Sequence, residues 1–285
     1  MHYESQFGIW IDPSSYFTWK NPPIHPKAWE NDVRKVLVTI GLSKVGRAVL
    51  NAIRLHGLVV RIVPDPWDIT ICSSSEATTV EGDEKQFALT KAIAQLNRVA
   101  GTKLPEMRAV ITFTPDKWNK GGACYKLKRQ ISQYTPSTDE ILLHELVHAL
   151  RIVSKKLVLN DATDKGLIMY ENDEEFFAVL VENMYTSELH SAPLRSSHTG
   201  FMEMDKHLQG SLEFFQVSGK AFEKVKKFAM ENQGLAKALS NIEVPFNPLN
   251  AYFCHTAKAR EMSRSSYAKM RDLGPVGMVF APLLK

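Results

Sequence analysis

Two histidines and a glutamate in one short run have the types and spacing to hold and use a metal ion. The run is His144-Glu145-Leu146-Val147-His148. Residues i and i+4 share one face of an α-helix, so His144 and His148 can direct both imidazoles at one ion. Glu145 lies about 100° around the helix, where it can reach a water beside the metal and take its proton as general base. This is the HExxH arrangement of many zinc peptidases, so we expect zinc as the cofactor and Glu145 as the catalytic residue.

The residues around this run predict a buried helix. Ser137, followed three residues later by Glu140, is a capping box that marks a helix start. From Ile141 to Val153 the chain is apolar except at the three site residues and Arg151. Polar groups buried without partners cost several kcal/mol, so these groups need a partner. A metal ion is the interpretation we favour, and a histidine pair satisfied by hydrogen bonds is the alternative.

A catalytic zinc usually takes three protein ligands and leaves a fourth position open. Ser154 stands where a metzincin-type site would place its third histidine. A second helix, capped by Asn172, offers carboxylates instead, and we predict Glu175 as the third ligand. Glu174 is the runner-up and Glu171 comes third.

Two roles on this second helix stay open. Glu175 is three residues beyond Asn172 and could act only as a capping carboxylate. Glu182, about two turns onward, is a candidate hydrogen-bond partner for a ligand histidine, or a solvated side chain.

A peptidase also needs a donor for the developing oxyanion, and the spacing does not choose among the candidates near the second helix. These are Tyr170, Tyr185, Arg195 and His198. A loose group of histidines could alternatively supply a ligand: His190, His198 and His207.

The sequence from Leu142 to Arg151, that from Glu174 to Val179, and the residues Glu182-Asn183 and Tyr185 resemble the NleD-like zinc metallopeptidases. This is a family of bacterial effectors and toxins, and similar domains are fused to the type VI spike protein VgrG. The resemblance covers about residues 36–200 and is strong only over 140–190. It implies a gluzincin-type site with two histidines and a glutamate, in a zinc metalloendopeptidase that cleaves a protein in a target cell.

The resemblance also implies partners and a route. The partners would be a protein or peptide substrate, a component of a type III or type VI secretion apparatus, and a cognate immunity protein. The amino terminus lacks the basic and apolar regions of a signal peptide. We therefore expect a protein made in the cytoplasm and secreted by a specialised system. Two alternatives are a zinc hydrolase acting on a cell-wall peptide and a non-catalytic interaction protein whose structural metal has a fourth protein ligand.

The pattern of the chain predicts an α+β, zincin-like fold with a buried HExxH helix, a second glutamate-bearing helix and a small mixed sheet. Residues 1–30 are expected as an extended, aromatic and proline-rich lead, and 31–285 as one domain, with a small α/β lobe at 31–80 as an alternative. Strands are expected at 33–40, 58–63 and 109–114. By analogy with the architecture of zinc peptidases, the last is expected as the edge strand along which a peptide lies. Helices are expected at 45–55, 83–100, 137–153, 172–185 and 222–239, with a loop at 116–129 and no assignment after 247.

Composition sets limits on partners and compartment. The net charge of +4 over 285 residues gives little support to nucleic-acid binding. No run approaches the eighteen or so apolar residues of a membrane span, so none is expected. Cys72, Cys124 and Cys254 are too scattered for a disulfide framework and are expected as free buried thiols.

Overall fold

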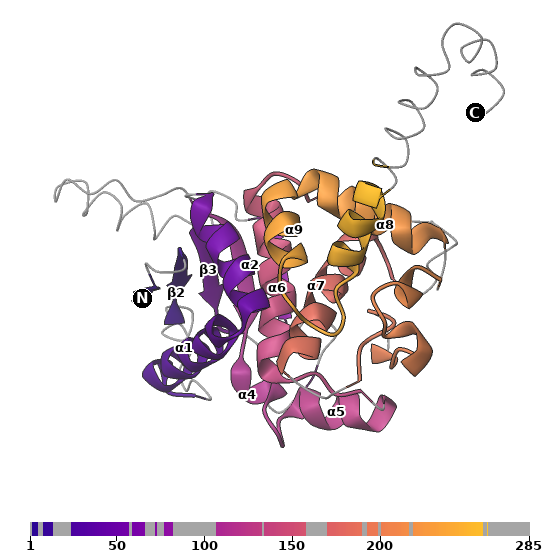
Figure 1. The fold of residues 1–285 in the computed structure, drawn as a ribbon. Helices are drawn as coiled ribbons and strands as arrows, with labels where there is room; N and C mark the ends of the chain where they lie inside the picture. Colours follow the sequence, from indigo (N-terminus) through magenta and orange to yellow (C-terminus); the bar gives the residue numbers. More distant parts are fainter. Residues whose placement is uncertain are drawn as a thin grey trace, which may run out of the picture.

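The computed structural model describes residues 2–4, 8–13, 24–56, 59–65, 72, 77–81, 107–132, 134–157, 170–189, 193–198, 201–216, 219–258 and 261. Over these residues the protein is α+β and mostly helical. A small sheet lies at one side, and the helices form the rest of the body (Figure 1).

The sheet has five strands in the order β1-β2-β3-β5-β4. The three central strands are parallel, and the two outer strands run antiparallel to their neighbours. The strands are β1 (His2–Glu4), β2 (Ile9–Ile11), β3 (Val59–Val63), β4 (Ala77–Glu81) and β5 (Met107–Phe113).

Alternate residues of the sheet face the main core. Side chains of a strand alternate between faces, so one face carries every second residue. On β2, β3 and β5 these residues are fully buried: Ile9, Ile11, Val60, Ile62, Ala109, Ile111 and Phe113. Between them, Trp10, Val63 and Val110 form a small separate cluster. The sheet therefore packs its aliphatic face against the helices.

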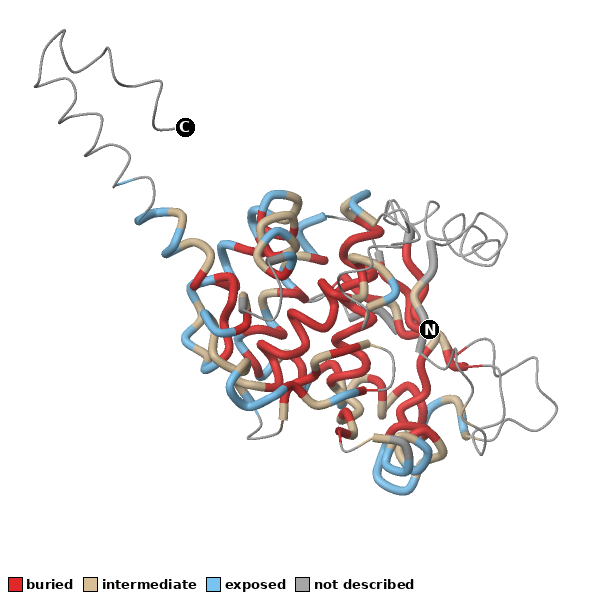
Figure 2. Tube along the Cα trace, turned by 90° about the vertical axis from the view of Figure 1, so that its right-hand side faces the viewer, coloured by how far each residue is buried: buried red, intermediate tan, exposed pale blue. Residues whose placement is uncertain are grey.

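The helices are α1 (Pro26–Leu42), α2 (Lys44–Leu55), α4 (Pro115–Trp118), α5 (Ala123–Ile131), α6 (Thr138–Val153), α7 (Asp173–Leu189), α8 (Gly219–Glu231) and α9 (Gln233–Ser240). Short 3₁₀ turns lie at Lys206–Leu208 and Glu213–Gln216, and a last helical segment covers 248–258. Helix α6 lies near the centre, with the sheet, α1 and α2 on one side of it and α7 and α8 on the other (Figure 1). Buried residues fill the interior of the molecule (Figure 2), and α6 is buried at every residue from Glu140 to Val153.

The two central helices begin where the sequence predicts. The backbone N–H of Ser137 donates to Glu140 Oε2 at 2.6 Å, which is the reciprocal half of a capping box. At the start of α7, Asn172 Oδ1 accepts from the N–H of Glu175 at 3.0 Å. The predicted helices over 137–153 and 172–185 are therefore confirmed.

The strand predicted at 33–40 is wrong, because this stretch is the interior of α1. His25 caps the helix and Pro26 occupies its first turn, where proline is pre-organised for helix. Trp29, Val33, Leu37 and Ile40 are buried at helical spacing. Their periodicity outweighed the β-branched composition on which the strand was predicted.

The strand predicted at 109–114 exists as β5, but it is not an edge strand. β5 lies between β3 and β4, so β4 occupies that edge of the sheet. The loop predicted at 116–129 contains helices α4 and α5. These helices are short, and the two glycines between them, Gly121 and Gly122, are typical of a loop.

Within the extended lead predicted at 1–30, β2 pairs with β3, and α1 already begins at Pro26. One hydrophobic cluster joins residues of 31–80 to α6 and α9, so the described residues give no sign of an independent lobe there. The helix predicted at 222–239 is broken at Asn232 into α8 and α9. The helix predicted at 83–100 lies outside the described residues.

The cysteines differ from the prediction. Cys72 and Cys124 form a disulfide that ties the chain between β3 and β4 to α5. Cys254 is free and exposed rather than buried. The prediction was wrong because residues 52 positions apart in sequence gave no local signal of pairing.

Among the described residues no single helix has the length and apolar character to cross a membrane. Only α1 and α2 taken together meet that test, and they are bent by 111° at their junction.

Candidate metal centre

The nitrogen and oxygen atoms of the three predicted ligands converge on one point between α6 and α7. His144 Nε2 lies 3.1 Å from His148 Nε2 and 3.1 Å from Glu175 Oε2. His148 Nε2 lies 3.3 Å from the same oxygen. We call His144, His148 and Glu175 the tripod.

The size of this triangle fits a small metal ion. Donor atoms about 2.0–2.1 Å from a tetrahedral zinc lie about 3.3 Å from one another. The three measured separations are close to that value. The i and i+4 spacing on α6 brings the two histidines together, and the first turn of α7 supplies the carboxylate.

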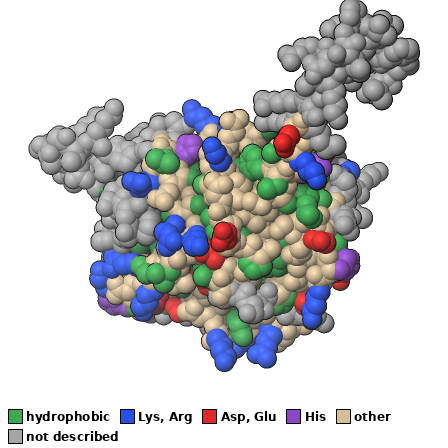
Figure 3. Space-filling view, viewed as in Figure 1, with side chains coloured by type: hydrophobic (Ala, Val, Ile, Leu, Met, Phe, Trp, Pro, Cys, Tyr) green, Lys and Arg blue, Asp and Glu red, His purple; other side chains and the backbone are tan. Residues whose placement is uncertain are grey.

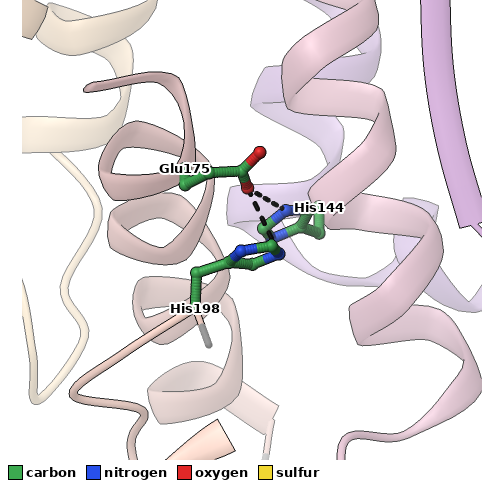
Figure 4. Close-up of side chains that lie close together, drawn as sticks. All are labelled: His144, Glu175 and His198. Carbon is green, nitrogen blue, oxygen red and sulfur yellow. Dashed lines mark hydrogen bonds and ion pairs between the residues drawn. The ribbon is translucent and has the colours of Figure 1, made fainter. Parts of the chain in front are cut away.

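A third histidine, His198, lies beside His144 and Glu175 (Figure 4). Its Nε2 is 3.3 Å from Glu175 Oε2, and its ring stacks on that of His144 with centroids 5.3 Å apart. The donor atoms of His144, Glu175 and His198 all lie within 4.8 Å of one another, and this group could hold a metal ion. Together with the tripod, His198 makes up the metal centre. The sequence offered His198 only as one of several unranked candidates.

The protonation of the centre reflects its crowding with carboxylates. Burial alone would lower the pKa of His144, but Glu175 and Glu182 raise it to about 10. Burial would raise the pKa of Glu175, yet hydrogen bonds from His144 and His148 hold it far below its usual value. Burial and the nearby charge of His144 lower the pKa of His198. Without a metal, a proton on His144 therefore balances the buried negative charge.

A buried ion pair fixes the far side of His144. His144 Nδ1 lies 3.0 Å from Glu182 Oε2, so Glu182 is the histidine's partner and is not solvated. Arg195 Nη1 donates to both oxygens of Glu182, at 2.8 and 2.6 Å. Burial would raise the pKa of Glu182, but Arg195 and His144 lower it. Such a partner fixes the ring orientation and tautomer of a ligand histidine.

The same arginine also holds the segment that carries His198. Arg195 Nε donates to the carbonyl of Ser197 at 3.2 Å, and its Nη2 donates to the carbonyl of His198 at 3.2 Å. His198 Nδ1 lies 2.7 Å from Glu171 Oε2. Glu171, the third-ranked ligand candidate, therefore contacts His198 rather than the two histidines of α6.

Glu145 points toward the sheet. Thr79 Oγ1, on β4, donates to Glu145 Oε2 at 2.7 Å and lies 3.0 Å from the carbonyl oxygen of the same residue. The sequence gave no signal for Thr79, because no strand was predicted at Ala77–Glu81.

Glu174, the runner-up ligand, is occupied elsewhere. Arg151 Nη2 donates to Glu174 Oε1 at 2.7 Å, and Arg151 Nε contacts Oε2. Arg151 also pairs with Glu231 at 2.8 Å and stacks on the ring of Phe177. Consecutive residues of a helix point in directions about 100° apart, so Glu174 and Glu175 contact different partners.

The remaining candidates for the oxyanion donor and for a further ligand contact other parts of the fold or lie away from the metal centre. Tyr185 donates to Asp139 Oδ2 at 2.5 Å in the first turn of α6, so its hydroxyl links the two helices. Arg195 donates hydrogen bonds to Glu182, and the ring of Tyr170 packs on that of Phe176. His207 is exposed on a 3₁₀ turn, and His190 lies outside the described residues.

Two described clefts lie away from the metal centre. One, of about 690 Å³, lies between α2 and α9, and another, of about 490 Å³, lies at the start of α6. Neither is lined by a residue of the metal centre. On the face shown in Figure 3, lysine and arginine side chains lie at separate places with acidic ones among them, so the described positive charge is spread over that face.

Comparisons with protein-family models, with curated proteins and with solved structures gave no match to this chain. The resemblance to NleD-like metallopeptidases therefore stays a prediction.

Proposed function

We propose that the protein is a zinc-dependent metallopeptidase, with His144, His148 and Glu175 as metal ligands and Glu145 as general base. The observation that carries this proposal is the convergence of the tripod to separations near 3.3 Å, on residues predicted from the sequence. The donor set of two imidazoles and one carboxylate suits zinc and leaves room for a further ligand.

The chain's own residues supply the remaining functions. When bound, zinc polarises a peptide carbonyl and acidifies a neighbouring water. Glu145 follows His144 directly on α6, and its carboxylate takes the proton from the attacking water. Glu182 and Arg195 keep His144 in one orientation.

The edge strand β4 supplies a place for an extended substrate. β4 pairs only with β5 among the described strands, so its other edge can hydrogen-bond a peptide. Thr79 of this strand contacts Glu145, which puts the strand next to the proposed base. We therefore assign to β4 the substrate-binding role that the sequence analysis predicts for 109–114.

One observation favours a second candidate function, a structural metal in a non-catalytic protein. His198 Nε2 lies 3.3 Å from Glu175 Oε2, where it could act as a fourth ligand and close the site. In the peptidase, His198 instead remains off the metal. Replacing His198 by alanine separates the two: a fourth ligand is needed for zinc affinity, whereas a histidine that remains off the metal is not.

The disulfide bears on the proposed site of action. Disulfides persist in oxidising compartments and are rare in the cytosol. The Cys72–Cys124 bond thus supports a protein that acts after secretion, in the periplasm or outside the cell. A cell-wall peptide is the alternative substrate in that compartment.

The test compares zinc-loaded wild type with Glu145→Gln. We expect both to bind one zinc, and the variant to cleave a denatured protein about 10²–10⁴-fold more slowly, the usual contribution of a general base. The same two proteins are also tested for cleavage of peptidoglycan, the alternative substrate. Equal activity of the two proteins, or no cleavage of either substrate by the wild type, would contradict the peptidase proposal.

A further inference from the structure

Thr79 reaches Glu145 from a different element of the fold. Thr79 pairs in register with Ile111 of β5, and cross-strand partners share a face of the sheet. Ile111 is fully buried in the main core, which includes the residues of α6. The hydroxyl of Thr79 therefore points toward α6, where it donates to Glu145 Oε2 at 2.7 Å.

We propose that Thr79 is a positioning residue that fixes the carboxylate of Glu145 for catalysis, an inference that rests on the peptidase function proposed above. A glutamate side chain has several rotamers, and a catalytic base must be held within about 0.5 Å of its working position. Threonine is stiff at χ1 because its Cβ is branched. A donor of this kind on a paired strand limits the positions that the carboxylate can take.

The contact also gives the two oxygens of the Glu145 carboxylate different roles. Oε2 accepts from Thr79, so the second oxygen, Oε1, is assigned to the attacking water. β4 pairs with β5 on one side over five residues, from Ala77 to Glu81. A peptide bound along the other side of β4 would be aligned by the same strand that holds the base. The hydroxyl thereby links the position of the substrate to that of Glu145.

A purely structural role makes different predictions. If Thr79 only ties β4 to α6, its loss lowers stability but leaves turnover by the folded protein unchanged. If it positions the base, its loss lowers kcat while KM stays near that of the wild type. Thr79→Val keeps the shape and removes the hydroxyl, and Thr79→Ser keeps the hydroxyl and removes the methyl group. Thr112→Val, on the neighbouring strand β5, is the matched control.

The experiment measures kcat, KM and zinc content for the zinc-loaded full chain and these variants. We expect Thr79→Val to lose about tenfold in kcat with KM within about twofold, because the carboxylate of Glu145 loses the hydrogen bond that holds it in its working position. Thr79→Ser should stay within about threefold of the wild type, and Thr112→Val should be unchanged. Adding Thr79→Val to Glu145→Gln should cause no further loss, because the hydroxyl acts through Glu145.

A crystal structure of each metal-free variant gives a readout independent of activity. The carboxylate of Glu145 should occupy one position in the wild type and in Thr79→Ser, and more than one in Thr79→Val. Unchanged kcat in Thr79→Val, equal losses in the valine and serine variants, or a single unaltered position of Glu145 would overturn the positioning role. A wild type as active as Glu145→Gln would instead overturn the peptidase function itself.

Discussion

Two buried clusters on α6 and α7 are made of similar groups and differ in where their positive charge comes from. In the first, Arg151 neutralises Glu174 and is supported by Glu231. In the second, the metal centre, the carboxylate of Glu175 faces three histidines. In the first cluster the positive charge is a side chain of the protein, Arg151. In the second cluster it must come from a bound proton or metal ion.

This difference explains why neighbouring glutamates have different roles. An arginine is charged at all ordinary pH values and cannot bind a metal, so Glu174 belongs to the core. A neutral histidine offers a lone pair, so Glu175 belongs to a group that could hold a metal ion. The four predictions that follow test this separation, from the largest expected effect to the smallest.

Glu175→Gln should reduce zinc affinity by about 10²–10³-fold. Apparent zinc free energies of about 10–16 kcal/mol in zinc-finger peptides, which have four ligands, give about 2.5–4 kcal/mol for each ligand. Zinc competition with a chromophoric chelator measures the change. Unchanged affinity would remove Glu175 from the ligand set.

Glu174→Gln should leave zinc affinity within a few-fold and lower the free energy of unfolding of the metal-free protein by about 3 kcal/mol. This is the lower end of the range for breaking a buried ion pair, because Glu231 still contacts Arg151. Urea unfolding in the presence of a chelator measures it. A large loss of zinc affinity in the folded variant would show that the two clusters are not separate.

Glu182→Gln should weaken zinc binding about 10–100-fold, the usual effect of losing the partner of a ligand histidine. The buried charge of Arg195 loses its counterion at the same time, so the variant should also be less stable. Calorimetric zinc titration of the folded variant separates the two effects. If the variant binds zinc as tightly as the wild type, Glu182 acts only as the counterion of Arg195.

Zinc binding at pH 7 should release about one proton. The pKa of His144 is raised to about 10, so the metal-free site is protonated at pH 7, and zinc requires the neutral ring. Apparent affinity should therefore rise about tenfold per pH unit between pH 7 and 9. Titration in buffers of different ionisation enthalpy counts the protons, and a count of zero would contradict the protonated state.

The site could be predicted further than the fold. His144, Glu145 and His148 follow from i and i+4 spacing within a capped apolar helix, a purely local signal. Helical spacing on α7 offered Glu182 as a candidate partner for a ligand histidine, with a solvated side chain as the alternative, and its contact with His144 decides between them. His198 could not be ranked among the candidates, and the sequence gave no signal for Thr79, because their positions depend on tertiary contacts made by Arg195 and on the strand order.

The errors in the fold have physical causes of the same kind. β-branched residues of α1 resembled a strand, and the tertiary packing of Trp29, Val33 and Leu37 decided for a helix. The strand order, which makes β4 and not β5 the edge, is a long-range property. The Cys72–Cys124 disulfide is also long-range, and spacing alone could not reveal it.

The most direct test of the metal centre is equilibrium dialysis against buffered zinc, followed by elemental analysis, for the wild type, Glu145→Gln and His148→Ala. We predict one tightly held zinc per chain in the first two proteins and a much weaker site in the third. No retained zinc in the wild type, or equal retention in all three, would contradict a metal centre built on His144, His148 and Glu175.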